Sequence, residues 1–373
     1  MKLLNLLLMI VMFSLPCYSQ QYLLEAKYNA VENDYNFWVC TPPNYIAKDS
    51  TQKVDPSTNT SDSITNSNPD TILTCSSNQK YPLVVFLHGA SLCGHDLNRV
   101  RRYGCLHAIK MGRDINAVIL APQNPGGAWN PHKLLKLMNY MSDNYDIDTN
   151  RIYVLGMSLG GYGTIDFCAT YPEKIAAAMA LCGGHSGMGT VKNLGKLPLW
   201  IIHGTKDRAV PISCSKNVVA QLEEQQNDSL LMYTWLPGGS HGAPAKLFYM
   251  PKTYEWLFSH SLRDSIRTIN RSFTVSMSDL PHAYEGITKT VDRIKVTGYI
   301  APVYSSQNHS YDNSYSGPMV DYEKCQVHVV KSGDVLVNLA KRYHVTVDQI
   351  CRLNHISRNS MLHIGQKLRI REK

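Results

Sequence analysis

The chain has 373 residues, 44% of them hydrophobic, and a formal net charge of +8. This length and apolar content suffice for one or two domains with buried cores and exclude a wholly disordered chain. No basic stripe interleaved with aromatic residues occurs, and beyond residue 15 no apolar run approaches the ~20 residues of a membrane span, so we expect neither nucleic-acid binding nor a transmembrane segment.

The N-terminus has the parts of a secretory signal peptide. Lys2 precedes an apolar run over 3–15, and the small residue Ser19 closes the region. We therefore predict a signal peptide over 1–19 and a mature protein that is secreted or periplasmic, or associated with the cell wall. A lipoprotein anchored on Cys17 is the alternative, but the Leu-Pro pair before that cysteine makes a poor lipobox.

Nine cysteines would remain in the mature chain, and an odd number leaves at least one thiol free or paired with another chain. Their spacings fit no zinc pattern, and neither a metal nor another cofactor is expected. Cys40 and Cys75 flank a polar insert over about 49–78, which we interpret as a disordered surface loop whose ends a disulfide would join. Three further cysteines in apolar settings are expected to be buried: Cys168, Cys182 and Cys351.

The run over 82–87 is typical of a buried strand and opens into His-Gly-Ala (88–90). Gly89 lets the backbone turn at the end of this strand, next to the N–H of Ala90. A second strand ends near Pro122 and leads into a loop that contains Trp129. This tryptophan either stacks on a sugar ring or an aromatic acyl group, or anchors its loop against the domain.

A third apolar run over 151–155 is followed by Gly-Met-Ser-Leu-Gly-Gly (156–161) and then by a helical pattern. A serine between glycines on a strand-to-helix turn is typical of a nucleophile elbow, because only glycine fits the tight positions around the exposed hydroxyl. The alternative is a glycine-rich helix entry with Ser158 as its N-cap.

Two later strands end in residues that such a serine needs. The run over 197–202 leads to Asp207, and the run over 231–236 leads to a loop with His241. The carboxyl ends of neighbouring parallel strands share one edge of a sheet, and the order Ser, Asp, His is that of one family of catalytic triads. The backbone N–H groups of Leu159 and Ala90 are candidate oxyanion donors. A solvated turn aspartate and an ordinary loop histidine are the alternatives.

Between 82 and about 261 the chain resembles the α/β-hydrolases grouped as predicted peptidases, dienelactone-hydrolase-like esterases and feruloyl-esterase-like carboxylesterases. The resemblance is carried by VVFLHGA (84–90), LAPQ (120–123), GMSLGGYG (156–163), WIIHG (200–204) and YEWL (254–257). It implies an α/β fold with a mostly parallel sheet and flanking helices, and hydrolysis of carboxylic esters by Ser158, Asp207 and His241. The chain departs from the group after Ala90, where Ser91 replaces a frequent glycine.

Residues 263–325 carry no strong signature and are interpreted as a linker, in which 291–303 has strand-like patterning and 304–322 is rich in Ser, Asn and Tyr. The C-terminal segment over 326–371 has a strand–helix–helix–strand pattern with a capping box at Thr346.

This segment resembles a LysM module through VHVVKSGDVL (327–336), Asn354 and IGQKL (364–368). The family folds as an α+β unit of two helices on a two-stranded sheet and binds peptidoglycan or chitin-like polymers of N-acetylglucosamine. The resemblance implies sugar contacts from two loops, although Val335 replaces a usual threonine: Gly333, Asp334, Val335, Ile356 and Ser357. Residues 327–373 carry nine basic and three acidic side chains, so most of the net charge lies here.

These features together predict an exported serine esterase with its catalytic domain over 20–262, acting on an ester of a glycan or wall polymer to which the module binds. Two alternatives stay open. One is a serine peptidase of the prolyl-oligopeptidase-like group, and the other is a wall-binding protein whose first domain is not catalytic.

Overall fold

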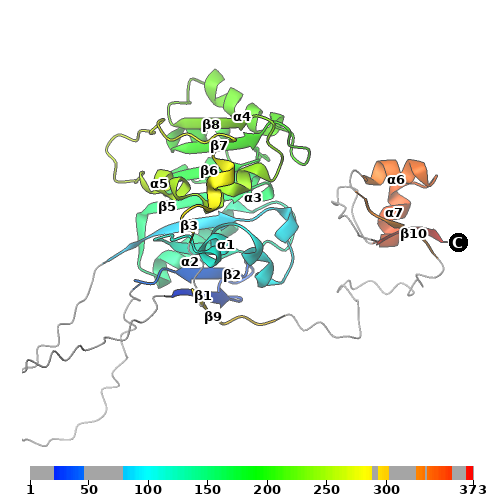
Figure 1. Ribbon diagram of the computed structural model, residues 1–373, viewed down its shortest axis with the longest axis horizontal. Helices are drawn as coiled ribbons and strands as arrows, with labels where there is room; N and C mark the ends of the chain where they lie inside the picture. Colours follow the sequence, from blue (N-terminus) through cyan, green and yellow to red (C-terminus); the bar gives the residue numbers. More distant parts are fainter. Residues whose placement is uncertain are drawn as a thin grey trace, which may run out of the picture. The chain divides into compact units, whose positions relative to one another are not determined.

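The computed structural model describes residues 21–45, 79–287, 293–301, 325–331, 334–354 and 367–372. The chain divides into two compact units, Met1–Val303 and Tyr304–Lys373 (Figure 1). The predicted signal peptide and the polar insert lie outside the described residues.

The first unit is built on a nine-stranded sheet with the order β8-β7-β6-β5-β3-β4-β2-β1-β9. Neighbouring strands from β8 to β4 are parallel, β2 is antiparallel to both β4 and β1, and β9 is parallel to β1. The central strands are apolar and buried along their whole length, as strands covered on both faces are. The strands are β1 (Tyr22–Lys27), β2 (Phe37–Thr41), β3 (Tyr81–Leu87), β4 (Val118–Pro122), β5 (Ile147–Met157), β6 (Ala177–Leu181), β7 (Leu199–Gly204), β8 (Leu231–Leu236) and β9 (Ile294–Thr297).

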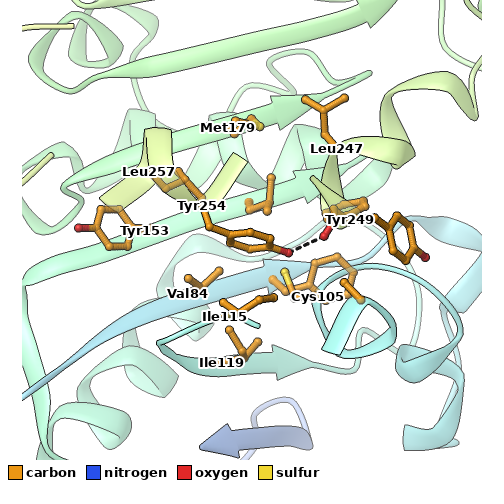
Figure 2. Close-up of a cluster of buried hydrophobic side chains, with 14 of the residues drawn as sticks. Val84, Cys105, Ile115, Ile119, Tyr153, Met179, Leu247, Tyr249, Tyr254 and Leu257 are labelled. Carbon is orange, nitrogen blue, oxygen red and sulfur yellow. Dashed lines mark hydrogen bonds between the residues drawn. The ribbon is translucent and has the colours of Figure 1, made fainter. Parts of the chain in front are cut away.

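Helices cover both faces of this sheet, and alternate residues of the strands from β2 to β8 belong to two separate cores. One core lies under α1 (Cys105–Met111), α5 (Pro251–Phe258) and the 3-10 helix η5 (Ala243–Tyr249). Figure 2 shows this core, with Tyr254 and Leu257 of α5 packed over Val84 of β3 and Met179 of β6. The other core lies under α2 (Pro131–Asn144), α3 (Leu159–Thr170) and α4 (Ser213–Glu224).

The predicted α/β fold with a mostly parallel sheet and flanking helices is therefore confirmed. Shorter 3-10 helices complete the unit: η1 (Ala90–Leu92), η2 (Leu97–Arg102), η3 (Pro172–Lys174), η4 (Val191–Lys196) and η6 (Leu280–Tyr284).

The segment after residue 262 differs from the linker that the sequence suggested. Its described residues up to 301 belong to the first unit, whose boundary falls at Val303. Val275, Leu280 and Ala283 are buried in the core under α5, and β9 extends the sheet beyond β1. The strand-like patterning over 291–303 thus includes a real strand, β9, while the described residues between 263 and 287 contain only the short 3-10 helix η6 as a regular element.

The second unit pairs β10 (Cys325–Val329) with β11 (Lys367–Glu372) in an antiparallel sheet, joined through α6 (Leu336–Arg342) and α7 (Val347–Asn354). This is the expected strand–helix–helix–strand order. The capping box at α7 is confirmed, since Thr346 N donates to Gln349 Oε1 at 2.7 Å and Gln349 N donates to Thr346 Oγ1 at 3.1 Å. A small core holds the unit together: Val330, Leu336, Leu339, Ala340, Ile350, Cys351, Leu368 and Ile370.

The cysteine predictions have mixed outcomes. Cys40 is a buried free thiol in β2, which contradicts a disulfide at that position; Cys75 lies outside the described residues. The three cysteines predicted to be buried are buried, as expected: Cys168, Cys182 and Cys351. Among the helices that the structure describes, none is both long and apolar enough to cross a bilayer.

Candidate active site

Ser158 stands between the end of β5 and the start of α3 with φ 58° and ψ −121°, a backbone conformation that L-residues rarely adopt. Two glycines allow this turn. A Cβ on Gly156 would lie 2.2 Å from Gly160 O, and one on Gly160 would lie 1.8 Å from Leu87 O. The helix therefore approaches the carboxyl end of β3 more closely than any side chain would permit, as the elbow interpretation expects.

The loop after β3 lies beside this serine. A Cβ built on Gly89 would lie 3.3 Å from the Cβ of Ser158 and 2.8 Å from the hydroxyl oxygen of Tyr103. The N–H of Gly89 donates to that oxygen at 2.5 Å. His88 is buried and accepts from Asn124 N at 3.0 Å, so its other ring nitrogen donates to Gly89 O at 2.8 Å. Neighbours on both sides thus fix the position of the loop.

The two residues whose N–H groups are predicted to donate to the oxyanion each stand at the start of a helix. Ala90 is the first residue of η1, and Leu159 is the first residue of α3. The first N–H groups of a helix have no partner within that helix. Both groups are therefore positioned to donate to a negatively charged oxygen next to Ser158, which remains a proposal for their role.

Asp207 and His241 are brought together as predicted. Asp207 lies in the loop after β7 and His241 in the loop after β8, and His241 Nδ1 is 2.7 Å from Asp207 Oδ2. The Asp207 side chain is inaccessible to solvent, whereas that of His241 is 29% exposed. Because Nδ1 is engaged by the carboxylate, Nε2 of His241 is the nitrogen left to exchange a proton with a reacting group.

Three hydrogen bonds and a close contact with His203 fix the Asp207 carboxylate. Its Oδ1 accepts from the N–H groups of Ala209 at 2.8 Å and Val210 at 2.9 Å, and its Oδ2 lies within reach of two histidines, His241 and His203. Burial alone would raise the pKa of Asp207, but hydrogen bonds from His241 and from the two backbone N–H groups outweigh burial and lower it. The acid is ionised at neutral pH without a cation of its own.

The end of β6 connects the serine to this pair. Ser158 N donates to Leu181 O at 2.8 Å, and the next residue, Cys182, places its thiol 3.6 Å from His241 O. Ligand atoms of Cys182, Asp207 and His241 lie within 4.8 Å of one another. Burial raises the thiol pKa, which disfavours the thiolate that a soft metal needs, and the carboxylate is already occupied by N–H donors. The cluster therefore fits a hydrogen-bonded group better than a metal site.

A cleft of about 580 Å³ adjoins the histidine on the side of the β7 and β8 loops. Its lining includes two exposed cationic side chains, those of Lys206 and Arg208. The cleft gives a substrate group access to His241 and is lined by Lys206, Arg208, Ala209, Gly238, Ser240, His241 and Gly242.

Trp129 is corrected from a candidate substrate contact to a loop anchor, the other interpretation that the sequence allowed. It is only 2% exposed, its indole N–H donates to His88 O at 3.2 Å, and its ring meets that of Tyr35 edge to face. The absence of a side chain at Gly163 of α3 makes room for the ring. A tryptophan enclosed in this way has no face to offer to a sugar.

Two family models match this chain. Residues 130–253 match the family described as Phospholipase/Carboxylesterase, and residues 328–371 match the LysM domain. The chain joins an α/β-hydrolase domain to a C-terminal LysM domain. The expected resemblances are confirmed, and the match to the hydrolase family includes the elbow, the acid and the histidine.

Curated relatives match short parts of the hydrolase domain. One is a bifunctional acetylxylan esterase/xylanase, XynS20E, of Neocallimastix patriciarum, 27% identical over 118 residues, or 27% of this chain and 17% of that protein. Another is a poly(3-hydroxyalkanoate) depolymerase C of Paucimonas lemoignei, 39% identical over 49 residues, or 13% of this chain and 12% of that protein. The chain thus spans less than a fifth of the length of either relative. Among solved structures, a thermostable esterase is similar at 26% identity and TM-score 0.46, covering 65% of this chain and 63% of that one.

In the LysM domain the structure reassigns one predicted sugar contact. The Asp334 carboxylate is 8% exposed; its Oδ2 lies 2.7 Å from His328 Nε2 and accepts from Lys331 N at 2.7 Å. These bonds lower the pKa of Asp334, first through Lys331 N–H and then through His328. The Asp334 carboxylate is therefore engaged by His328 and Lys331, whereas the neighbouring Val335 is 50% exposed. The other candidates, Gly333, Ile356 and Ser357, lie outside the described residues.

Proposed function

We propose that this protein is a serine carboxylic ester hydrolase that acts on esters of a glycan or cell-wall polymer. One observation carries the proposal. Ser158 occupies a strained elbow beside the loop of Gly89, while a buried carboxylate holds His241 by Nδ1 at the same edge of the sheet. The match of residues 130–253 to the Phospholipase/Carboxylesterase family, and relatives named as an acetylxylan esterase/xylanase and a poly(3-hydroxyalkanoate) depolymerase, support the choice of ester chemistry.

In the proposed reaction, Nε2 of His241 accepts the proton of the Ser158 hydroxyl as its oxygen attacks the ester carbonyl. The carbonyl oxygen becomes negatively charged and accepts hydrogen bonds from the N–H groups of Leu159 and Ala90. His241 then donates its proton to the leaving alcohol, and an acyl-enzyme remains on Ser158. Water, deprotonated by the same imidazole, hydrolyses this intermediate and restores the serine.

Asp207 contributes by position and charge. Its bond to Nδ1 keeps the proton of neutral His241 on that nitrogen, so that Nε2 carries the lone pair. Its negative charge stabilises the imidazolium that forms during both steps. Since hydrogen bonds lower the pKa of Asp207, this charge persists throughout the neutral range.

The LysM domain is proposed to hold the enzyme on peptidoglycan or a chitin-like polymer, and the protein to act in the periplasm or outside the cell. Its basic excess would add attraction to an anionic wall, which salt weakens. Tethering raises the local concentration of ester groups without any new contact at Ser158. The module and the hydrolase thus supply binding and chemistry separately.

Ser158→Ala tests both parts at once. We expect the variant to lose turnover of p-nitrophenyl acetate while sedimenting with insoluble peptidoglycan or chitin as wild type does. Ser259→Ala is the matched control, because this serine lies at the end of α5 and donates to Trp256 O, away from the elbow. Hydrolysis of peptide amides in preference to esters would favour the peptidase, and a wild-type protein that binds polymer but cleaves neither would favour a binding protein.

A further inference from the structure

The acid of the candidate triad faces a second histidine that the proposed reaction does not use. His203 is the penultimate residue of β7, four residues before Asp207, and both side chains are fully buried. Its Nε2 lies 3.1 Å from Asp207 Oδ2, the oxygen that also bonds His241, and 3.0 Å from Val210 O.

The protonation of His203 follows from its neighbours. Both oxygens near Nε2 can only accept, so the proton of the neutral ring lies on Nε2 and is shared between them. Nδ1 lies 2.8 Å from Ser215 Oγ, whose single hydroxyl proton has two acceptors within reach, Nδ1 itself and Gly183 O at 2.7 Å. Burial lowers the pKa of His203, which keeps the ring neutral at neutral pH although the nearby carboxylate opposes this shift.

We infer that His203 is a positioning residue that holds the Asp207 carboxylate oriented and ionised toward His241. This inference rests on the proposed function. The two backbone N–H groups fix Oδ1, and they leave Oδ2 to the two histidines and the Cys182 thiol. Without the N–H of His203, the nitrogen donor that restrains rotation of Oδ2 would be His241, which is itself the group that must be oriented.

The N–H of His203 would also influence the basicity of Asp207 and, through it, that of His241. An N–H that donates to Oδ2 spreads part of the carboxylate charge, so that less of it acts on His241. Removing this donor makes Asp207 a stronger base and stabilises the imidazolium form of His241. His241 would then remain protonated, and unable to act as a base, up to a higher pH than in wild type.

Other groups around Asp207 do not replace this donor. Cys182 from the end of β6 and Tyr162 from α3 face the carboxylate, and burial raises the pKa of both, so that each is neutral at neutral pH. Lys206 and Arg208 flank it in the chain but are exposed. His203 is therefore the buried nitrogen donor available to Oδ2 besides His241 among the described residues.

Two variants of the full-length protein separate a positioning role from a structural one. The amide nitrogen of glutamine in His203→Gln can occupy the place of Nε2, whereas asparagine in His203→Asn reaches only as far as Nδ1. For p-nitrophenyl acetate we expect His203→Asn to lower kcat about tenfold or more with little change in KM, as loss of a hydrogen bond to a charged group does. We expect His203→Gln to retain most of the activity.

The pH profile of kcat/KM supplies the readout that mere destabilisation would not move. Its acid limb should shift to higher pH in His203→Asn and stay near that of wild type in His203→Gln. The same two substitutions at His260 are the matched controls, since this histidine is also buried but bonds Trp256 O. They should affect thermal stability alone.

Equal losses in the two His203 variants, with unmoved acid limbs, would overturn the inference. If neither variant folds, Ser215→Ala, which removes the partner of Nδ1, should shift the acid limb in the same direction by less, and an unmoved limb would overturn it. A wild-type protein without esterase activity would instead refute the proposed function, so the two failures are distinguishable.

Discussion

Gly160→Ala tests whether close approach of α3 to β3 creates the oxyanion site. The added Cβ would lie 1.8 Å from Leu87 O, 2.5 Å from Leu87 C and 2.9 Å from His88 O. Real Cβ atoms essentially never come within 3.0 Å of such atoms, so α3 and β3 must separate by about 1.2 Å. All three atoms belong to backbone, which cannot turn aside as a side chain would.

This displacement acts on the two N–H groups proposed to bind the oxyanion. Leu159 precedes Gly160 on α3, and Ala90 follows the end of β3, so separating the two elements moves the donors apart. A misplacement of about 1 Å costs about 100-fold in rate, and overpacking costs about 1–3 kcal/mol of stability. We therefore expect kcat/KM for p-nitrophenyl acetate to fall about 100-fold, mainly through kcat.

The assay pairs steady-state kinetics with thermal unfolding of the same preparations. Gly195→Ala is the control, because its Cβ would meet the side chain of Asn227, which can move, in η4 outside the candidate site. It should lower stability slightly and leave kcat/KM unchanged. A folded Gly160→Ala protein with wild-type kcat/KM would refute the argument that this contact positions the donors.

Two further predictions concern residues that the structure reassigns. Trp129→Phe removes the indole bond to His88 O and should lower stability by about 1 kcal/mol with KM unchanged, whereas a raised KM at unchanged stability would indicate substrate stacking. Because the pKa of Asp334 is lowered by folding, its contribution to the LysM domain is complete above pH about 4 and is lost as pH falls through the folded value. Asp334→Asn should lack this acid-dependent loss, as measured by hydrogen exchange of the α6 amides in the full-length chain, and an identical loss in the variant would exclude Asp334 as its source.

The elbow and the order of the candidate triad are predictable because parallel strands bring their carboxyl ends to one edge. Apolar runs locate β5, β7 and β8, and the polar residues just beyond them must then lie near one another. The LysM fold is predictable for another reason. Local signals such as the capping box at Thr346 agree with its helix boundaries, so no long-range information is needed.

The position of the segment beyond residue 262 is harder to predict from the sequence, because hydrogen bonds from polar side chains help to attach it to the rest of the unit. Arg267 donates to Ile175 O and Lys196 O, and Arg271 donates to Leu231 O and Ser229 O, carbonyls distant in the chain. Such bonds leave no hydrophobic periodicity in the sequence. They fasten the segment to the ends of neighbouring strands, where only the folded sheet presents those carbonyls.

The roles of His203 and Trp129 depend on burial, which residue type alone does not reveal. A histidine at the end of a strand and a tryptophan in a glycine-rich loop are each compatible with exposure. The structure decides both through partners from elsewhere in the chain, Ser215 on α4 for His203 and the His88 carbonyl for Trp129. Each partner lies at least a dozen residues away in the sequence from the residue that it contacts.

The central claim is that Ser158 is made reactive by His241. A fluorophosphonate probe followed by peptide mapping tests it most directly, because this reagent forms a covalent adduct with an activated serine. We predict one adduct, on Ser158, in the wild-type protein and its loss in His241→Gln, with both proteins folded. An adduct on another residue, or labelling of Ser158 that persists without His241, would contradict the account.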